Sequence, residues 1–252
     1  MKKTKFLFCN FQVVMLSVLF SCIMFACSSD DNPAPNPTDP EAVFQKELDE
    51  ALSLAKLYGP ETQEVAELIA SRHKGLYTTI NYKTRESTER KCRTDHHGPF
   101  EISDLARTMI ICHYDSLKSV MSDLENTMKE RNKFDRHKHQ TSDYGYWGDL
   151  FNMQFPGLKT EIQVKCYSMF YATQYESVCR SVLGDSIYNV IRTTSGQEPS
   201  MLHEYYEIMR ADTASAATYE LYRQKSLEYS THFDPDYVKC LIFSYNLKYL
   251  FG

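Results

Sequence analysis

The sequence predicts an α+β domain with a mixed central β-sheet of about five strands flanked by helices. Apolar residues recur at helical spacing over 41–58 and again over 116–131. A tight apolar run at 107–113 is typical of a buried strand. Two alternating segments, 147–155 and 159–165, are separated by Pro156-Gly157 and predict a β-hairpin. Strands in the middle, with helices before and after them, favour a layered fold.

The remaining elements follow from local composition. Gly59-Pro60 is expected to end the first helix, so a second helix is expected over 61–73. Aromatic and β-branched residues predict a short strand at 76–82, and the polar window after it is compatible with a helix. The charged stretch 133–139 is ambiguous. Further helices are expected over 169–183, 201–210 and 214–229, before an apolar, aromatic end at 238–251.

The N-terminus has the form of an export signal. Basic residues precede an apolar run that ends in small residues, so 1–26 is interpreted as a lipoprotein signal peptide. Cys27 is the preferred acylation site, although Cys22 also fits, and an uncleaved membrane anchor is the alternative. Residues 27–40 are rich in proline and aspartate and predict a disordered tether. The single domain then spans 41–252, and the expected location is the periplasmic or cell-surface side of the envelope.

Charge and cysteine content exclude several classes of protein. The net charge of -5 gives no overall attraction to nucleic acid or to an anionic membrane. The cysteines after the signal are irregularly spaced and lack a C-x-x-C pair, which argues against a zinc site and against a dense disulfide framework. A single disulfide bond between two of them is still compatible with the sequence. These cysteines are Cys92, Cys112, Cys166, Cys179 and Cys240.

One strand of the expected hairpin carries polar residues on a single face. Because side chains alternate along a strand, Glu161, Gln163 and Lys165 should share one face and Ile162 and Val164 the other. That polar face either lines a cleft or is simply solvated, as is common in antiparallel sheets.

Asp104 lies just before the apolar strand at 107–113, where a side chain can project into a cleft. Turn chemistry, or an ion pair with Arg107, would explain it equally well. Alternatively, Asp104 and Glu161 converge on one Mg²⁺, because magnesium sites commonly combine one or two carboxylates with substrate phosphates.

A basic window follows the short strand. Residues 83–93 contain five cations in eleven residues, and a helix would place Lys83, Ser87 and Arg90 or Lys91 on one face. Such a face suits a polyphosphate, because arginine matches phosphate oxygens, although a charge run can also be a solvated surface. Further along, Tyr144 to Asp149 combine glycines and aromatics, which suits either a base-stacking platform or a hairpin entry in which Trp147 is part of the core.

The order of these motifs resembles the synthetase domain of the RelA/SpoT family, a nucleotidyltransferase-like fold, over about residues 74–230. The match follows the short, single-domain alarmone synthetases and their toxin relatives. A later helix, 202–210, resembles one that follows the sheet in many short members. The motifs are Lys83-Thr84-x-x-Ser87-x-x-Arg90-Lys91, Ile102-x-Asp104-Leu105-x-Arg107-x-x-Ile110, Gly145-Tyr146-x-x-Asp149 and Glu161-Ile162-Gln163-Val164.

The resemblance implies transfer of the β,γ-pyrophosphate of ATP to the ribose 3′-hydroxyl of a guanine nucleotide or a related acceptor. It implies that Asp104 and Glu161 hold Mg²⁺ and that Glu161 activates the hydroxyl. It implies that Tyr146 stacks on the acceptor base and that Gln163 supports the acceptor. The implied phosphate cradle consists of Lys83, Arg85, Ser87, Arg90 and Lys91, supported by Arg107.

The chain also departs from the family pattern. Longer members have Gly-Tyr-Arg-Ser-x-His at the position of Gly145 to Asp149, so the acceptor is in question. After Glu-Ile-Gln-Val the family often has a basic residue followed by threonine. This chain has Lys165-Cys166 there, so it keeps only the positive charge. No companion hydrolase with paired metal ligands is found. His96-His97 and His137-x-His139 lack carboxylate partners at metal-site spacing and are interpreted as surface histidines.

The expected location of the chain conflicts with its expected substrate, because an exported lipoprotein faces a compartment that contains little ATP. Three explanations stay open: a toxin delivered into another cell, with a partner protein that neutralises it; another acceptor, tRNA included; or a degenerate fold that binds nucleotides without catalysis. A surface structural or adhesion lipoprotein is the remaining hypothesis. Both acids and the basic window are present, which argues against a degenerate fold, so an active pyrophosphotransferase is the preferred hypothesis.

Overall fold

The computed structural model describes residues 39–211 and 213–233. The predicted signal peptide, Cys22, Cys27, nearly all of the predicted tether, Cys240 and the apolar end at 238–251 lie outside these residues. Within them, no helix is both long enough and apolar enough to span a bilayer. The described cysteines, Cys92, Cys112, Cys166 and Cys179, are buried free thiols.

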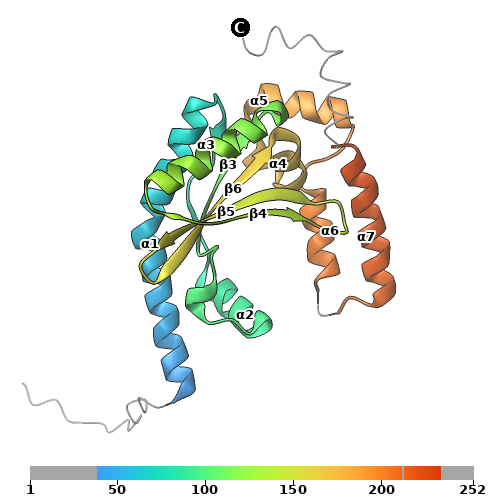
Figure 1. The fold of residues 1–252 in the computed structure, drawn as a ribbon. Helices are drawn as coiled ribbons and strands as arrows, with labels where there is room; N and C mark the ends of the chain where they lie inside the picture. The colour runs from blue at the N-terminus through green and yellow to red at the C-terminus, as the bar shows by residue number, and fades with distance from the viewer. Residues whose placement is uncertain (1–38, 212, 234–252) are drawn as a thin grey trace, which may run out of the picture. The chain divides into compact units, whose positions relative to one another are not determined.

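A mixed β-sheet forms the centre of the domain, as predicted (Figure 1). Its order is β1-β3-β6-β5-β4, and β2 also pairs with β3. β3 and β6 are parallel, whereas the other pairs are antiparallel. The strands are β1 (Leu76–Tyr77), β2 (Asn81–Tyr82), β3 (Ala106–Cys112), β4 (Phe134–Thr141), β5 (Trp147–Phe155) and β6 (Leu158–Cys166).

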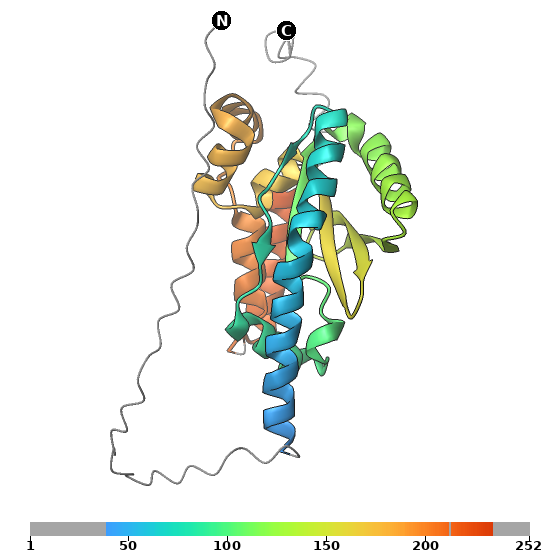
Figure 2. The ribbon, with the colours of Figure 1, turned by 90° about the vertical axis from the view of Figure 1, so that its left-hand side faces the viewer.

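Seven α-helices surround the sheet in the described part of the chain. Figure 2 shows α3 on one side of the sheet and the α6–α7 pair on the other. The helices are α1 (Pro40–Arg72), α2 (Arg85–Asp95), α3 (Leu117–Glu130), α4 (Tyr167–Thr173), α5 (Glu176–Ser195), α6 (Met201–Met209) and α7 (Ala216–Thr231). Short 3-10 turns at Pro99–Glu101 and Tyr114–Ser116 precede β3 and α3.

The expected break at Gly59-Pro60 is wrong, because α1 is one helix with Pro60 inside it. Proline removes one backbone hydrogen bond and crowds the preceding turn, which usually ends a helix. Here tertiary contacts hold both halves. The Thr62 hydroxyl hydrogen-bonds with that of Thr160 on β6, and the Tyr58 ring stacks on Phe155 at 4.5 Å.

The structure also decides or corrects three other segments. The segment 133–139, which the sequence left ambiguous, belongs from Phe134 onward to an edge strand, β4, whose backbone pairs with β5. The helix expected over 169–183 is two helices, α4 and α5, and α5 continues to Ser195 after a bend at Gly184. The expected strand at 76–82 is two short strands along β3.

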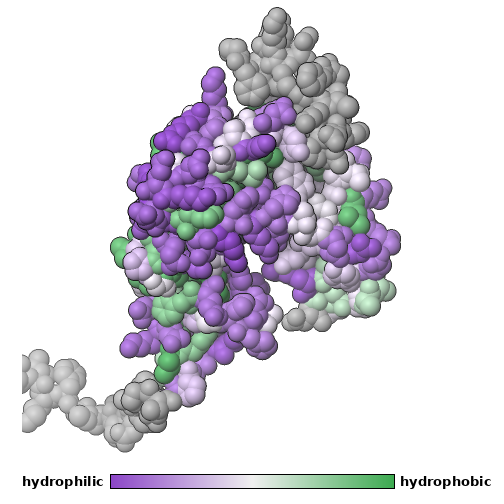
Figure 3. Space-filling view, viewed as in Figure 1, coloured by the Kyte–Doolittle hydropathy of each residue, from purple (hydrophilic) through white to green (hydrophobic). Residues whose placement is uncertain are grey.

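The main core lies on the face of the sheet covered by α1 and α3. Ile162, Val164 and Ile110 from the strands pack with Val65 of α1 and Leu124 of α3, all fully buried. The face of the domain seen in Figure 3 is mostly hydrophilic, with small separate hydrophobic areas. One face of β6 is therefore fixed in the core, and its other face is directed to the opposite side of the sheet.

Candidate active site

The polar face of β6 is buried. Glu161, Gln163 and Lys165 expose 6%, 7% and 3% of their surface, while Ile162 and Val164 on the other face are in the core. The alternation that predicted two faces is confirmed. The solvated alternative is wrong, because a solvated sheet face would leave these long polar side chains exposed. Burying such groups is costly unless they have partners, so their partners indicate what the face is for.

Asp104 is held by two lysines. It lies in the turn before β3, and its carboxylate oxygens accept from Lys83 Nζ at 2.8 Å and from Lys91 Nζ at 2.9 Å. Asp104 therefore pairs with these lysines and not with Arg107, which was one of the alternatives. Burial alone would raise the pKa of Asp104, but the hydrogen bonds and charges of the two lysines outweigh it, and the pKa falls from 3.8 to about 2. Asp104 is thus a fixed anion.

Glu161 lies between neighbours on three sides. Its Cα is paired with that of Arg107 on β3 and that of Asn152 on β5, and its Oε1 accepts from Gln163 Nε2 at 2.8 Å. Burial raises the pKa of Glu161, the Gln163 hydrogen bond and the Arg107 charge oppose that rise, and the Asp104 charge adds to it. The two acids, far apart in sequence, therefore act on one another in the folded domain.

The described residues do not form a metal site from side chains alone. They contain no group of three or more His, Cys, Asp or Glu side chains arranged to hold an ion. Asp104 and Glu161 offer only carboxylate oxygens, the ligand type that Mg²⁺ prefers, and magnesium commonly completes its shell with water and substrate phosphates. The residues present fit a substrate-assisted magnesium site.

Helix α2 presents two opposite faces. Its N-cap is Thr84, whose hydroxyl accepts from the Ser87 backbone N–H. Ser87 and Lys91 are one turn apart on the side that meets Asp104, and Arg90 lies on the exposed surface beside them. Of the predicted cradle residues, Lys83 and Lys91 therefore meet at Asp104, and helical spacing places Ser87 and Arg90 on the neighbouring surface of α2.

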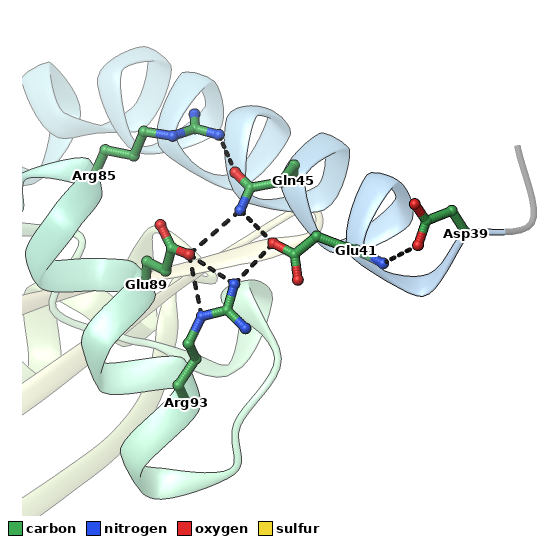
Figure 4. A network of polar contacts seen from close by, with 6 residues as sticks. All are labelled: Asp39, Glu41, Gln45, Arg85, Glu89 and Arg93. Atoms are coloured by element: carbon green, nitrogen blue, oxygen red, sulfur yellow. Dashed lines mark hydrogen bonds and ion pairs between the residues drawn. The ribbon is translucent and has the colours of Figure 1, made fainter. Parts of the chain in front are cut away.

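The opposite face of α2 attaches it to α1, and this is where Arg85 lies (Figure 4). Its guanidinium donates to Asp49 and Gln45 of α1 rather than pointing to Asp104. Arg93 binds Glu41 at 2.8 Å and Glu89 at 2.7 Å in the same network. Because these contacts are exposed, each adds little to the stability of the fold. Together they set the angle at which α2 lies against the site.

Tyr146 is positioned by a tight turn between β4 and β5. Gly145 has a φ of +89°, which favours glycine, and a side chain there would collide with Ser230 of α7. The Tyr146 hydroxyl lies over Gly148, and its ring lies 5.2 Å from Lys165 Nζ. Burial, and then the Glu161 charge, raise the pKa of Tyr146. Its position beside Glu161 suits the predicted stacking role, whereas Trp147 packs edge-on against Tyr114 at the margin of the core.

Lys165 belongs to this site, although the motifs alone did not assign it a role. Its Nζ donates to Thr173 Oγ1 of α4 at 3.1 Å. Burial disfavours the charged ammonium and Arg107 repels it, so the pKa of Lys165 falls from 10.5 to about 7. Its place two residues after Gln163, on the same strand face, is the sequence signal that could have identified it.

Lys165→Met is expected to raise the free energy of unfolding at pH 7 by roughly 1–4 kcal/mol, because an apolar side chain of similar length replaces a buried cation. The folded-state pKa lies below the unfolded value, so the unfolded chain binds more protons between pH 7 and 10.5 and wild-type stability rises over that interval. The advantage of methionine should therefore shrink towards pH 10.5. Urea unfolding checks this, with the more exposed Lys159→Met as the matched control. Equal gains at both positions would contradict it.

His137 and His139 are exposed, as expected, but they are not isolated. Both rings contact the buried carboxylate Oδ1 of Asp149, at 2.9 and 3.0 Å, and His137 stacks on Phe151. They lie on the core face of the sheet, opposite Glu161, because they alternate with residues of the other face. His96 and His97 are exposed, as expected.

Known proteins give an independent comparison. No family model matches the chain. It is 30% identical over 182 residues to the (p)ppApp synthetase toxin Tas1 of Pseudomonas aeruginosa (strain UCBPP-PA14), covering 69% of this chain and 41% of that protein. Our chain therefore spans less than half the length of this relative.

Solved structures agree with the sequence comparison. The crystal structure of the complex between the type VI effector Tas1 and its immunity protein matches with a TM-score of 0.62 and 27% identity, over 74% of this chain and 96% of that one. Small alarmone synthetase 1 from Bacillus subtilis matches with a TM-score of 0.40 and 15% identity, over 79% and 96%, a likeness too distant to support an argument. With the motifs and the mixed sheet described above, the two Tas1 matches identify the chain as having the RelA/SpoT-like synthetase fold.

Proposed function

We propose that this chain is an ATP-dependent pyrophosphotransferase that modifies the ribose 3′-hydroxyl of a purine nucleotide. One observation carries the proposal: a buried glutamate with a raised pKa lies beside Arg107, and an anionic Asp104 clamped by two lysines lies nearby. Perturbed carboxylates beside a set of cations are typical of sites that handle protons and phosphates.

The reaction would transfer an intact pyrophosphate. The 3′-oxygen of the acceptor attacks the β-phosphorus of ATP, the bond between that phosphorus and the α–β bridging oxygen breaks, and AMP leaves. Glu161 accepts the proton of the attacking hydroxyl, and its raised pKa suits a general base that operates near neutral pH. Lys83, Lys91 and Arg107 would neutralise the phosphate oxygens, and this kind of transfer depends mainly on alignment and charge.

Magnesium is the cofactor that this donor set fits. Asp104 and Glu161 would hold it together with phosphate oxygens of ATP. Bound there, Mg²⁺ would neutralise charge on the transferring group. Lys83 and Lys91, which occupy the oxygens of Asp104 in this structure, would then be released to contact the phosphates.

The acceptor is proposed to be an adenine nucleotide, with a guanine nucleotide as the alternative. The family resemblance alone favoured guanine, but the relative at 30% identity is named a (p)ppApp synthetase. The motif around Tyr146 also departs from the longer family members, so the acceptor preferences of those members carry little weight here.

A toxin role would explain why an exported chain carries a site for nucleotides. The matched effector structure is a complex with an immunity protein, which supports the proposal that a neutralising partner exists for this chain as well. Export as a lipoprotein acylated at Cys27 remains part of the proposal and rests on the N-terminal pattern alone.

A label-transfer assay tests the activity. The purified full-length chain is incubated with γ-³²P-ATP, Mg²⁺ and, in separate reactions, AMP, ADP, GDP, GTP or tRNA. We expect label on an adenine nucleotide, with one AMP released for each pyrophosphate transferred. A folded chain that labels none of the acceptors would contradict the enzymatic proposal and leave the degenerate, binding-only alternative.

A further inference from the structure

A polar row crosses four strands of the sheet on the face that carries Glu161. Register places Arg107 of β3 beside Glu161 of β6, Glu161 beside Asn152 of β5, and Asn152 beside Arg136 of β4. Paired residues on neighbouring strands direct their side chains to the same face and lie within contact range. The row therefore extends the site beyond the family motifs, to two residues that none of those motifs includes.

Asn152 has one fixed orientation in this row. Its Oδ1 accepts from Arg136 Nη2 at 2.9 Å and from Arg136 Nε at 3.3 Å. Arginine donates only, so the amide oxygen has to face Arg136 and the amide nitrogen has to face the other way. Asn152 exposes 1% of its surface, and its Nδ2 is buried without a hydrogen-bond partner.

A buried donor without a partner is unfavourable, and native proteins rarely keep one without a reason. Three such side-chain atoms occur among the described residues, and the other two belong to Tyr188 and Ser200. The Asn152 nitrogen differs from them because the neighbouring residue on β6 is Glu161, whose Oε1 accepts from Gln163. An ionised carboxylate accepts several hydrogen bonds, so Glu161 can take a second amide donor.

We propose that Asn152 is a positioning residue that donates from its Nδ2 to the Glu161 carboxylate, and that Arg136 holds Asn152 in the required orientation. Gln163 and Asn152 then grip the carboxylate from two directions, with the Arg107 charge on its third side. The consequence for catalysis rests on the proposed function. The hydrogen bond itself does not.

Asn152→Asp separates positioning from simple strand packing. The new carboxylate still accepts from Arg136, but it has no donor for Glu161 and repels it. We expect kcat to fall about ten- to a hundredfold, the range for losing a hydrogen bond to a charged group, while KM for ATP stays within about twofold. Asn152→Gln, which can restore a donor, should recover part of kcat. Wild-type kcat in Asn152→Asp would overturn the proposal, because a structural role through Arg136 would survive this change.

Arg136 is tested by a double-mutant cycle. Arg136→Ala frees the Asn152 amide to rotate, so kcat should fall severalfold. In the Asn152→Leu variant, the same change at Arg136 should have almost no effect on kcat. Arg131→Ala, which removes an arginine bound to Glu64 at the surface, is the control and should leave kcat unchanged. Additive losses for Arg136 and Asn152, or a raised KM for ATP in Arg136→Ala, would show that Arg136 acts on its own.

A wild-type chain without transfer activity would count against the proposed function, and the hydrogen bond would then be decided by stability. Urea unfolding of the Asn152→Leu, Glu161→Gln and double variants gives their coupling without any turnover. Favourable coupling between the two positions supports the assignment. Strictly additive changes would overturn it.

Discussion

Glu161→Gln is expected to abolish pyrophosphate transfer, with a loss in kcat of about 10³-fold or more, and to leave the fold intact. The amide has nearly the same shape and keeps an oxygen that can accept from Gln163. It cannot take the proton of the attacking hydroxyl, and it brings no negative charge to the metal. Because burial raises the pKa of Glu161, a neutral side chain at this position should not lower the free energy of unfolding.

The measurement combines label transfer with thermal unfolding of the same preparation. Glu64→Gln is the matched control, because Glu64 is an exposed acid of α1 that pairs with Arg131. The control should keep wild-type activity. Transfer by Glu161→Gln within tenfold of wild type would remove Glu161 from the reaction. An unmutated chain that binds nucleotide without turnover, and a variant that binds it equally well, would favour the binding-only alternative.

Asp104→Asn is expected to abolish transfer and also to destabilise the domain at neutral pH. The change leaves Lys83 and Lys91 close together without the anion that both of them bind. The pKa of Asp104 is about 2 in the folded chain, below its ordinary value of 3.8. That difference corresponds to about 2 kcal/mol of stability, which is present above pH 4 and lost as the pH falls towards 2.

Urea unfolding at several pH values checks the second expectation. Wild type should be more stable than Asp104→Asn at pH 7, and the difference should become small near pH 2, where about half of Asp104 is protonated in the folded chain too. Asp123→Asn is the control, because Asp123 pairs with Arg72 and His73 at a more exposed site and should cost less than about 1 kcal/mol. A stability difference that stays constant from pH 7 to pH 2 would contradict the assignment of Asp104.

Much of the fold could be predicted because the sequence patterns that specify its strands and turns each span only a few residues. The alternation in β6 and the Pro156-Gly157 turn both act over a few residues, and the structure confirms the hairpin that they predicted. The continuity of α1 could not be predicted in this way. It depends on Thr62 and Tyr58 meeting residues about a hundred positions away on the hairpin.

The candidate site was predictable where it rests on motifs. The motif order identified Asp104, Glu161 and the lysines, and the structure brings the two lysines onto Asp104. Roles for Asn152 and Arg136 were not predictable, because strand register across β4, β5 and β6 decides what lies next to Glu161. The contact of Arg85 with α1, and that of His137 and His139 with Asp149, likewise depend on packing between segments distant in sequence.

The most direct test of the account is a crystal structure of the full-length chain with Mg²⁺ and an ATP analogue that cannot be hydrolysed between the α- and β-phosphates. We expect one ion in contact with carboxylate oxygens of Asp104 and Glu161 at about 2.1 Å, with Lys83 and Lys91 turned to the phosphates. An analogue bound elsewhere in the fold, or an ion that touches neither acid, would contradict it.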